Sequence, residues 1–190
     1  LMKLAKNISL LILAGAVSIS AMAQSGSKSK PQQKEYHFTT VKANPVTEVK
    51  DQNETGTCWC FSTISFLESE AIKKGAPMDI DLSEMFVVSK SYTERAIKYI
   101  RLDGSLRFEA GSDVGDVLEV LESDGLVPNS VMPGLNYGAT EHIHWELTEG
   151  LKGYLQAIVK NPNRKLSTAW LNGFNNILKA YLGEMPQKFT

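Results

Sequence analysis

Five segments of the chain repeat apolar residues at helical spacing, so the sequence predicts a mainly α-helical protein. Lys73 and Lys74, followed by Gly75, are end signals for the first helix, which we expect to begin at Cys58. The stripes that we expect to form the core are Phe61, Ile64, Leu67, Glu68, Ala71 and Ile72; Phe86, Val87, Tyr92, Ala96 and Tyr99; Val114, Val117, Leu118 and Leu121; Leu147, Leu151, Tyr154, Leu155 and Ile158; and Trp170, Leu171, Phe174, Ile177, Leu178 and Tyr181.

Capping residues place the ends of the later helices. Ser83 and Ser112 are the expected N-caps of the second and third helices, because their hydroxyls can accept from free N–H groups of the first turn. Gly125 ends the third helix and Gly183 the fifth. The connection over 133–140 is rich in turn residues.

The N-terminal residues have the pattern of a targeting segment. Lys3 and Lys6 precede an apolar run over 8–19, and Ala21 and Ala23 form a small-x-small cleavage site. We therefore expect a signal peptide over residues 1–23 and an exported protein, periplasmic or secreted. The alternative is a membrane anchor, but the run is shorter than the roughly 20 residues that span a bilayer.

Two further segments precede the first helix. Residues 24–35 are rich in Ser, Lys and Gln, and this composition predicts a disordered leader. Residues 36–49 alternate weakly and are interrupted by Pro45, which favours an extended arm over a central strand.

Composition narrows the classes of function. Charged residues make up 22% of the chain and the net charge is -1, which argues against a nucleic-acid partner. Cys58 and Cys60 are the only cysteines. A disulfide between positions i and i+2 of a helix is geometrically poor, because the two side chains point to different faces. We expect two free thiols, no metal and no cofactor.

The candidate chemistry lies at the start of the first helix. Gln52 precedes Cys58 by six residues, and Gly56 and Trp59 flank that cysteine. A thiol attacks as the thiolate, which a helix N-terminus favours through its free N–H groups and dipole. The backbone N–H of Cys58 and the side-chain amide of Gln52 can donate to a developing oxyanion, with Trp59 packed behind. A lone buried cysteine is more often an inert small hydrophobe, but the joint pattern is far more specific.

This pattern, Gln-x5-Cys-Trp-x-Phe-Ser, resembles the active-site signature of papain-like cysteine peptidases, above all the branch of bleomycin hydrolase and aminopeptidase C. Thr55 stands where papain has a disulfide-bonded cysteine, which that branch lacks. Residues 82–84, Leu-Ser-Glu, resemble the start of the family's second helix, and residues 125–128, Gly-Leu-Val-Pro, resemble a stretch of this branch. The residues from about 133 resemble its insertion.

The resemblance has implications for the fold and the site. The family is α+β, and residues 36–190 would be its helical left-hand domain, which carries the nucleophile helix. Cys58 would be the nucleophile and Gln52 the oxyanion-hole donor, with Gly111 and Trp59 binding substrate. The implied activity is peptide hydrolysis through a thioester acyl-enzyme, with aminopeptidase preference and a homo-hexameric full-length form.

Two positions depart from the family pattern. Cys60 replaces a small or aliphatic residue, so we expect an oxidation-prone second thiol close to the nucleophile. The usual pair of glycines in the substrate-binding strand reads Ala110-Gly111, which weakens the role assigned to Gly111.

A thiol peptidase also needs a histidine base, which in this family follows the cysteine by about 130–150 residues. His37 precedes Cys58, while His142 and His144 follow it by only 84 and 86 residues. We expect these two to be surface or locally hydrogen-bonded residues, because the His-x-His pair lacks further metal ligands at matching spacing. The sequence thus predicts an inactive N-terminal fragment without the C-terminal β-rich domain that carries His and Asn. Leu1 before Met2 fits an incomplete reading frame.

Two other functions stay open at this point. The chain could be a non-catalytic secreted helical domain that binds a partner and keeps a decayed peptidase site. A redox protein using Cys58 and Cys60 is the third reading, although their spacing is poor for a disulfide.

Overall fold

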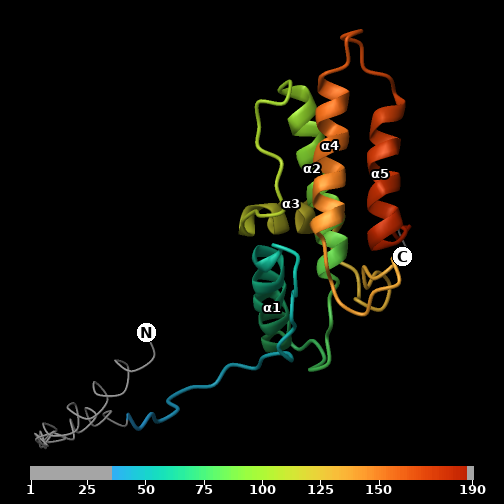
Figure 1. The fold of residues 1–190 in the computed structure, drawn as a ribbon. Coiled ribbons are helices and arrows are strands. Elements are labelled where there is room, and N and C mark those ends of the chain that lie inside the picture. The colour runs from blue at the N-terminus through green and yellow to red at the C-terminus, as the bar shows by residue number, and fades with distance from the viewer. Residues whose placement is uncertain (1–35, 188–190) are drawn as a thin grey trace, which may run out of the picture. The chain divides into compact units, whose positions relative to one another are not determined.

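The computed structural model describes residues 36–187, and five helices with two isolated β-bridges make up the regular structure of these residues. The prediction of a mainly α-helical chain is confirmed. The predicted signal peptide, 1–23, and leader, 24–35, lie outside the described residues. The helices are α1 (Cys58–Lys73), α2 (Glu84–Arg101), α3 (Val114–Asp124), α4 (Trp145–Val159) and α5 (Ala169–Leu182) (Figure 1).

The chain divides into two compact units, residues 1–41 and residues 42–190. The described part of the first unit, 36–41, is exposed and forms neither helix nor strand. In the second unit, residues 42–53 form neither helix nor strand, as predicted for the arm up to residue 49. No helix within residues 36–187 combines the length and apolarity that crossing a membrane requires.

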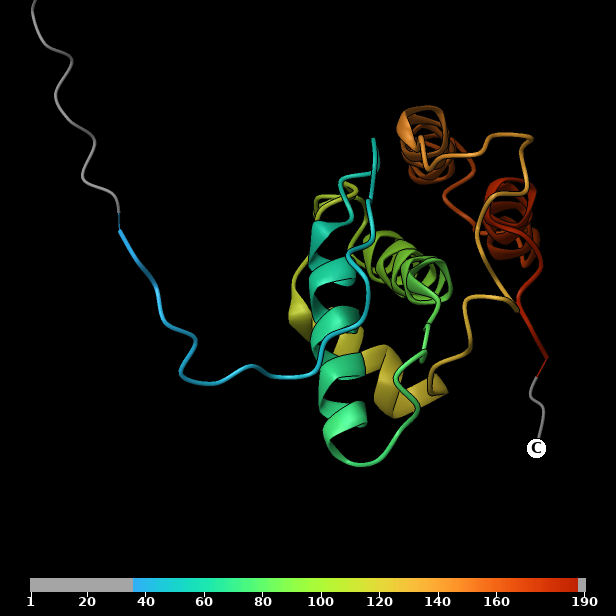
Figure 2. The same cartoon turned by 90° about the horizontal axis from the view of Figure 1, so that it is seen from below.

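Helix α2 is the centre of the second unit, because it packs against each of the other four helices. Viewed from below, α2, α4 and α5 are seen almost end-on, while α1 is seen from the side (Figure 2). Tyr92 of α2 and Phe174 of α5 both pack edge-on against Phe108, with ring centroids 5.9 Å apart in each pair. These rings are buried, and each buried aromatic or aliphatic side chain contributes about 1.5–3 kcal/mol to folding.

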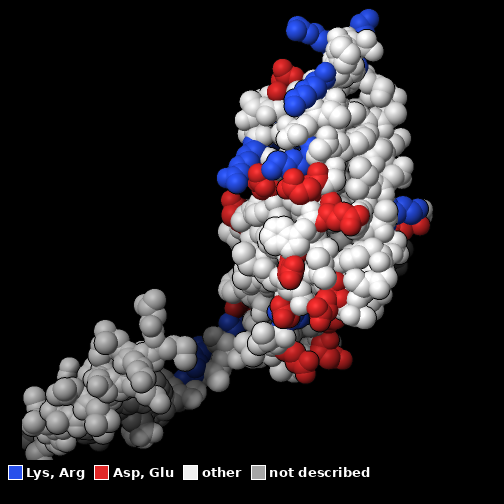
Figure 3. Space-filling model, in the orientation of Figure 1, with Lys and Arg blue, Asp and Glu red and all other residues white. Residues whose placement is uncertain are grey.

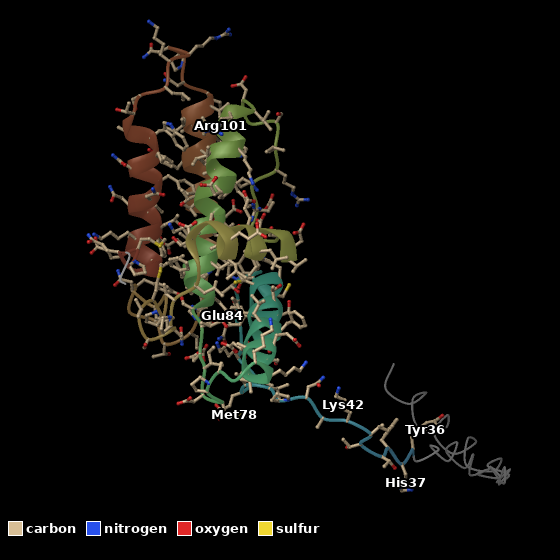
Figure 4. The ribbon with its side chains drawn as sticks, turned by 180° about the vertical axis from the view of Figure 1, so that it is seen from behind. Tyr36, His37, Lys42, Met78, Glu84 and Arg101 are labelled. Carbon is tan, nitrogen blue, oxygen red and sulfur yellow. The ribbon has the colours of Figure 1, made fainter. Side chains whose placement is uncertain are left out.

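The predicted start of the second helix is confirmed at Ser83. Its backbone is extended, and its hydroxyl accepts a hydrogen bond from the Phe86 N–H at 3.0 Å. The same hydroxyl donates to the Met132 carbonyl at 2.6 Å, which joins this cap to the segment before α4. Glu84 and Arg101 mark the two ends of α2 (Figure 4).

The third helix differs from its prediction at the cap and on its buried face. Asp113, not Ser112, is the N-cap, because its carboxylate accepts from the Gly115 N–H at 2.7 Å. Val114 and Leu118 were expected to be buried, but they are 54% and 41% exposed. Helix α3 buries only the narrow stripe, Val117 and Val120, that faces α1 and α2.

The fourth and fifth stripes form the expected core. Leu147, Leu151 and Leu155 of α4 and Phe174 of α5 are fully buried, and Leu178 of α5 is nearly so. The two helices pack against each other and against α2.

Candidate active site

The first turn of α1 presents the thiol of Cys58 to solvent. The helix begins at Cys58 itself, and this cysteine is exposed. Thr57 is the N-cap residue, but its hydroxyl pairs with that of Thr55 at 2.5 Å and does not cap the helix. Within residues 36–187, the backbone N–H groups of Cys58 and Trp59 donate to no protein group. They are therefore available to a developing negative charge on a bound ligand.

Gln52 lies on the loop over residues 51–57 and is half-buried. The neighbouring Asn53 has φ +52°, a turn in which its N–H donates to the Asp51 carboxylate at 2.8 Å. Among the described groups, none forms a hydrogen bond with the side-chain amide of Gln52. The amide is uncommitted, and its role as an oxyanion donor stays a prediction.

The segment Ala110-Gly111 lies directly against the loop over residues 51–57. The indole Nε1 of Trp59 donates to the Ala110 carbonyl at 3.1 Å, and the Tyr92 hydroxyl approaches the same oxygen at 3.5 Å. A Cβ on Gly56, which has φ +67°, would lie 3.1 Å from the Ala110 Cβ, so this close approach favours glycine. Gly111 is exposed. The fold thus brings together the loop before Cys58 and the segment assigned to substrate binding.

Trp59 itself is only 6% exposed. Its indole N–H holds the Ala110 carbonyl, and its packing behind the thiol stays a prediction. Its assignment to substrate binding stays a prediction.

Arg95 and Glu109, which the sequence analysis did not single out, hold the same segment from the other side. Arg95 Nη2 donates to the Glu109 carbonyl at 2.6 Å, and its guanidinium lies 5.7 Å from the centre of the Phe108 ring. The Glu109 carboxylate pairs with Lys152 of α4 at 3.1 Å and with Arg107 at 3.2 Å. These two cations lower the pKa of Glu109 below its usual range, Lys152 contributing first. Basic and acidic side chains lie next to each other on this face (Figure 3).

A buried ion cluster anchors the chain just before the loop. Lys50 Nζ lies 3.1 Å from Glu68, 2.9 Å from Glu84 and 2.6 Å from Asp81. Glu68 is fully buried, and its second oxygen accepts from the Thr47 hydroxyl at 2.6 Å. Burial by itself lowers the pKa of Lys50, but its three carboxylate partners raise it above the usual value. Lys50 is two residues from the predicted oxyanion donor, so the cluster fixes the origin of that loop.

The prediction that Cys60 is an oxidation-prone second thiol is wrong. Cys60 is fully buried, and its Sγ donates to the Glu84 carbonyl at 3.4 Å. Burial, reinforced by the Glu84 carboxylate, raises the pKa of the Cys60 thiol well above its usual value. Cys58 is exposed and Cys60 is buried because the side chains at positions i and i+2 of α1 point to different faces of the helix. Both thiols are free, as predicted.

We expect only one of these thiols to react in the folded protein. An aromatic disulfide reagent should modify Cys58 within minutes and leave Cys60 unmodified until the protein is unfolded, since a buried protonated thiol is neither accessible nor nucleophilic. Peptide mapping after brief exposure measures this. Equal modification of both residues under native conditions would contradict the burial of Cys60.

The prediction that His144 is a surface or locally hydrogen-bonded residue is also wrong. His144 is 1% exposed, and neither ring nitrogen has a hydrogen-bond partner among the described residues. His142 is half-buried and packs edge-on against Phe61 of α1 and against His144, at centroid distances of 6.3 Å and 5.7 Å. The cause is the path of residues 142–144, which pair by backbone hydrogen bonds with Glu54 and turn the His144 ring inward. Neither ring forms a hydrogen bond with the described side chain of Cys58.

The buried His144 should make stability fall in acid. Burial, then the neighbouring His142, lower the pKa of His144 to about 4. Between this value and the ordinary pKa of about 6.5, the unfolded chain binds a proton that the folded chain does not, so stability decreases as the pH falls. The loss should approach about 3 kcal/mol near pH 4. Urea unfolding at pH 7 and pH 4.5 measures it.

His144→Phe should remove most of this pH dependence, because phenylalanine keeps a ring and does not titrate. His37→Phe, on the exposed arm, is the matched control and should keep the wild-type dependence. The same acid loss in His144→Phe as in wild type would contradict the assignment.

Metal ligation has no support in the described part of the chain, where no three His, Cys, Asp or Glu side chains cluster to hold an ion. The exposed thiol, the free N–H groups beside it and the adjacent Ala110-Gly111 segment are the elements that acyl transfer to a cysteine uses.

Comparisons with known proteins find similarity to cysteine proteases. The family model described as papain family cysteine protease matches residues 33–100. A cysteine proteinase of Trypanosoma brucei brucei is 30% identical over an alignment of 105 residues, and the match covers 52% of this chain and 23% of the relative. The crystal structure of PepW from Lactobacillus rhamnosis HN001 is similar in fold, with a TM-score of 0.53 and 22% identity over 75% of this chain and 38% of PepW.

The match thus spans about a quarter of the curated relative and well under half of PepW. The residues matched by the family model include the 51–57 loop, Cys58, helix α1 and most of helix α2. The similarity to the papain family therefore rests on residues 33–100 and on the partial match to a cysteine proteinase.

Proposed function

We propose that the protein is a cysteine peptidase that hydrolyses peptide bonds through a thioester on Cys58. The observation that carries this proposal is the exposed thiol at the first residue of α1, next to unused N–H groups. The Cys58 sulfur attacks the scissile carbonyl carbon, and a carbon–sulfur bond forms while the carbon–nitrogen bond breaks. The amine leaves with a proton, and water then hydrolyses the thioester.

The proton of Cys58 needs a base, and we propose that this base is neither His142 nor His144. Among the described residues, the buried ring of His144 has no hydrogen-bond partner, and His142 packs on Phe61 without a hydrogen bond to the thiol. We therefore expect residues 24–190 alone to give no turnover, and the full natural chain to supply a histidine and an orienting asparagine from another segment.

Aminopeptidase action is the proposed mode, as in the bleomycin hydrolase and aminopeptidase C branch. The supporting features are the Leu82-Ser83-Glu84 start of α2, the Gly125–Pro128 stretch and the added helices α4 and α5. Fluorogenic dipeptides with a free or an acetylated N-terminus test it. Hydrolysis of only the free form supports an aminopeptidase, whereas equal hydrolysis of both indicates an endopeptidase.

Turnover by the full natural chain tests the function itself. Thiol-dependent hydrolysis of a peptide is the expected result. A folded full chain that hydrolyses neither form of the substrate would favour the alternative, a secreted helical binding domain with a decayed peptidase site.

Export and assembly complete the proposal. The Lys-rich and apolar pattern of residues 1–23 supports cleavage after Ala23, and a peptide is the proposed partner, with no nucleic acid and no membrane after cleavage. The branch resemblance supports a homo-hexamer of the full-length form. N-terminal sequencing of the exported protein and light scattering of the full chain measure the two.

A further inference from the structure

Residues 142–145 are hydrogen-bonded to the middle of the loop over residues 51–57 through Glu54. The Glu54 N–H donates to the His142 carbonyl, and the His144 N–H donates to the Glu54 carbonyl, both at 3.0 Å. These bonds form a parallel bridge between Glu54 and Ile143. The indole Nε1 of Trp145, the first residue of α4, donates to the Glu54 carboxylate at 2.8 Å. Residues 142–145 thus hold both the main chain and the side chain of Glu54.

The same segment also contacts α1 beyond the thiol. The His142 ring packs on Phe61, three residues after Cys58, while Glu54 is four residues before it. The His142 ring also packs on the buried ring of His144, which anchors the segment in the core. Residues 142–145 therefore brace the chain on both sides of Cys58.

We infer that Glu54 is a positioning residue, and that Trp145 holds the 51–57 loop in the geometry in which Gln52 and the Cys58 N–H meet an oxyanion. The inference rests on the proposed function. An oxyanion hole works when its donors are fixed in advance, and a loop needs supporting contacts to achieve this. Gln52 has no side-chain partner among the described residues, so the loop backbone must set its position.

Trp145 is suited to this role and to its test. It is 63% exposed, so its indole contributes little to the core. The substitution Trp145→Phe keeps an aromatic ring and removes only the N–H that binds Glu54. The change should loosen the loop without unfolding the protein.

Two reagents separate oxyanion binding from thiol access in the full natural chain. A peptidyl aldehyde adds to Cys58: the carbon–sulfur bond forms, the carbonyl π bond breaks, and the oxygen takes the thiol proton in the oxyanion site. Iodoacetamide alkylates the same sulfur by displacing iodide and develops no oxyanion. Trp145→Phe should raise the aldehyde dissociation constant by about 5- to 10-fold and change the alkylation rate by less than about twofold.

Matched variants complete the experiment. Glu54→Ala should reproduce the Trp145→Phe result, and Glu54→Gln, which keeps an acceptor, should rescue much of the loss. The double variant Glu54→Ala/Trp145→Phe should be no worse than the weaker-binding single variant, because both remove one contact. Trp170→Phe, on α5 and without an indole hydrogen bond among the described residues, should behave as wild type.

Wild-type aldehyde affinity in Trp145→Phe would overturn the inference and leave the proposed function intact. Parallel losses of aldehyde binding and alkylation would also overturn it, since they indicate general damage to the site. A wild-type chain that forms no aldehyde adduct at Cys58 would instead overturn the proposed function, and this inference with it.

Discussion

Cys58→Ala should lower kcat/KM for a peptide substrate by about 10⁴-fold or more in the full natural chain, because it removes the atom that forms the acyl-enzyme in the proposed mechanism. Cys58 is exposed at the start of α1, and its side chain makes no hydrogen bond within residues 36–187. The substitution should therefore leave folding unchanged, and the loss should appear in kcat. Steady-state hydrolysis of a fluorogenic peptide measures it.

The matched control is Cys60→Ala, two residues along the same helix. It removes a buried thiol that faces α2 and that plays no part in the proposed chemistry. We expect kcat/KM within about threefold of wild type and a modest loss of stability, of the order of 1 kcal/mol. A larger activity loss in Cys60→Ala than in Cys58→Ala would reverse the assignment of the two thiols.

The second large effect is on stability. Lys50→Met should lower the free energy of unfolding by about 3–5 kcal/mol, because it leaves the carboxylates of Glu68 and Glu84 buried without their cation. These two side chains are 0% and 6% exposed, and both lie within 3.1 Å of the Lys50 Nζ. Burial already raises the pKa of Glu84, against the influence of Lys50, so its anionic form depends on this partner. Urea unfolding at pH 7 measures the change.

Lys73→Met is the matched control for that substitution. Lys73 also pairs with a glutamate of α1, Glu70, but both side chains are more than a third exposed. A surface pair of this kind contributes about 1 kcal/mol or less. Equal destabilisation by the two variants would show that the buried cluster has no special importance for the fold.

Both effects involve one structural feature, the loop over residues 51–57 before Cys58. Lys50 anchors its beginning, Glu54 is held at its middle by residues 142–145, and α1 begins at its end. The site therefore depends on contacts between segments far apart in the chain. A change at any of the three anchors should alter the geometry of the donors.

Local patterns predicted much of this fold. The start of α1 at Cys58 and the cap at Ser83 follow from short-range signals, since a helix terminus depends on the residues beside it. The stripes of α4 and α5 were also correct, because each of these helices packs one broad apolar face.

The errors arose where contacts between residues far apart in the sequence determine which side chains are buried. Val114 and Leu118 are apolar and fit the helical period, but α3 has neighbours only along one narrow side. His144 reads as a polar loop residue, yet its backbone pairing with Glu54 turns the ring inward. The partners of Lys50 and Arg95 are separated from them in sequence, and no local pattern indicates them.

The central claim, that Cys58 is the acyl-accepting thiol, is tested most directly by a peptidyl epoxide. The thiol opens the epoxide, a carbon–sulfur bond forms, the carbon–oxygen bond breaks, and the new alkoxide takes a proton. Mass-spectrometric mapping of the treated full chain should find one adduct, on Cys58, and none on Cys60. An unmodified Cys58 in a folded, full-length protein would contradict the claim.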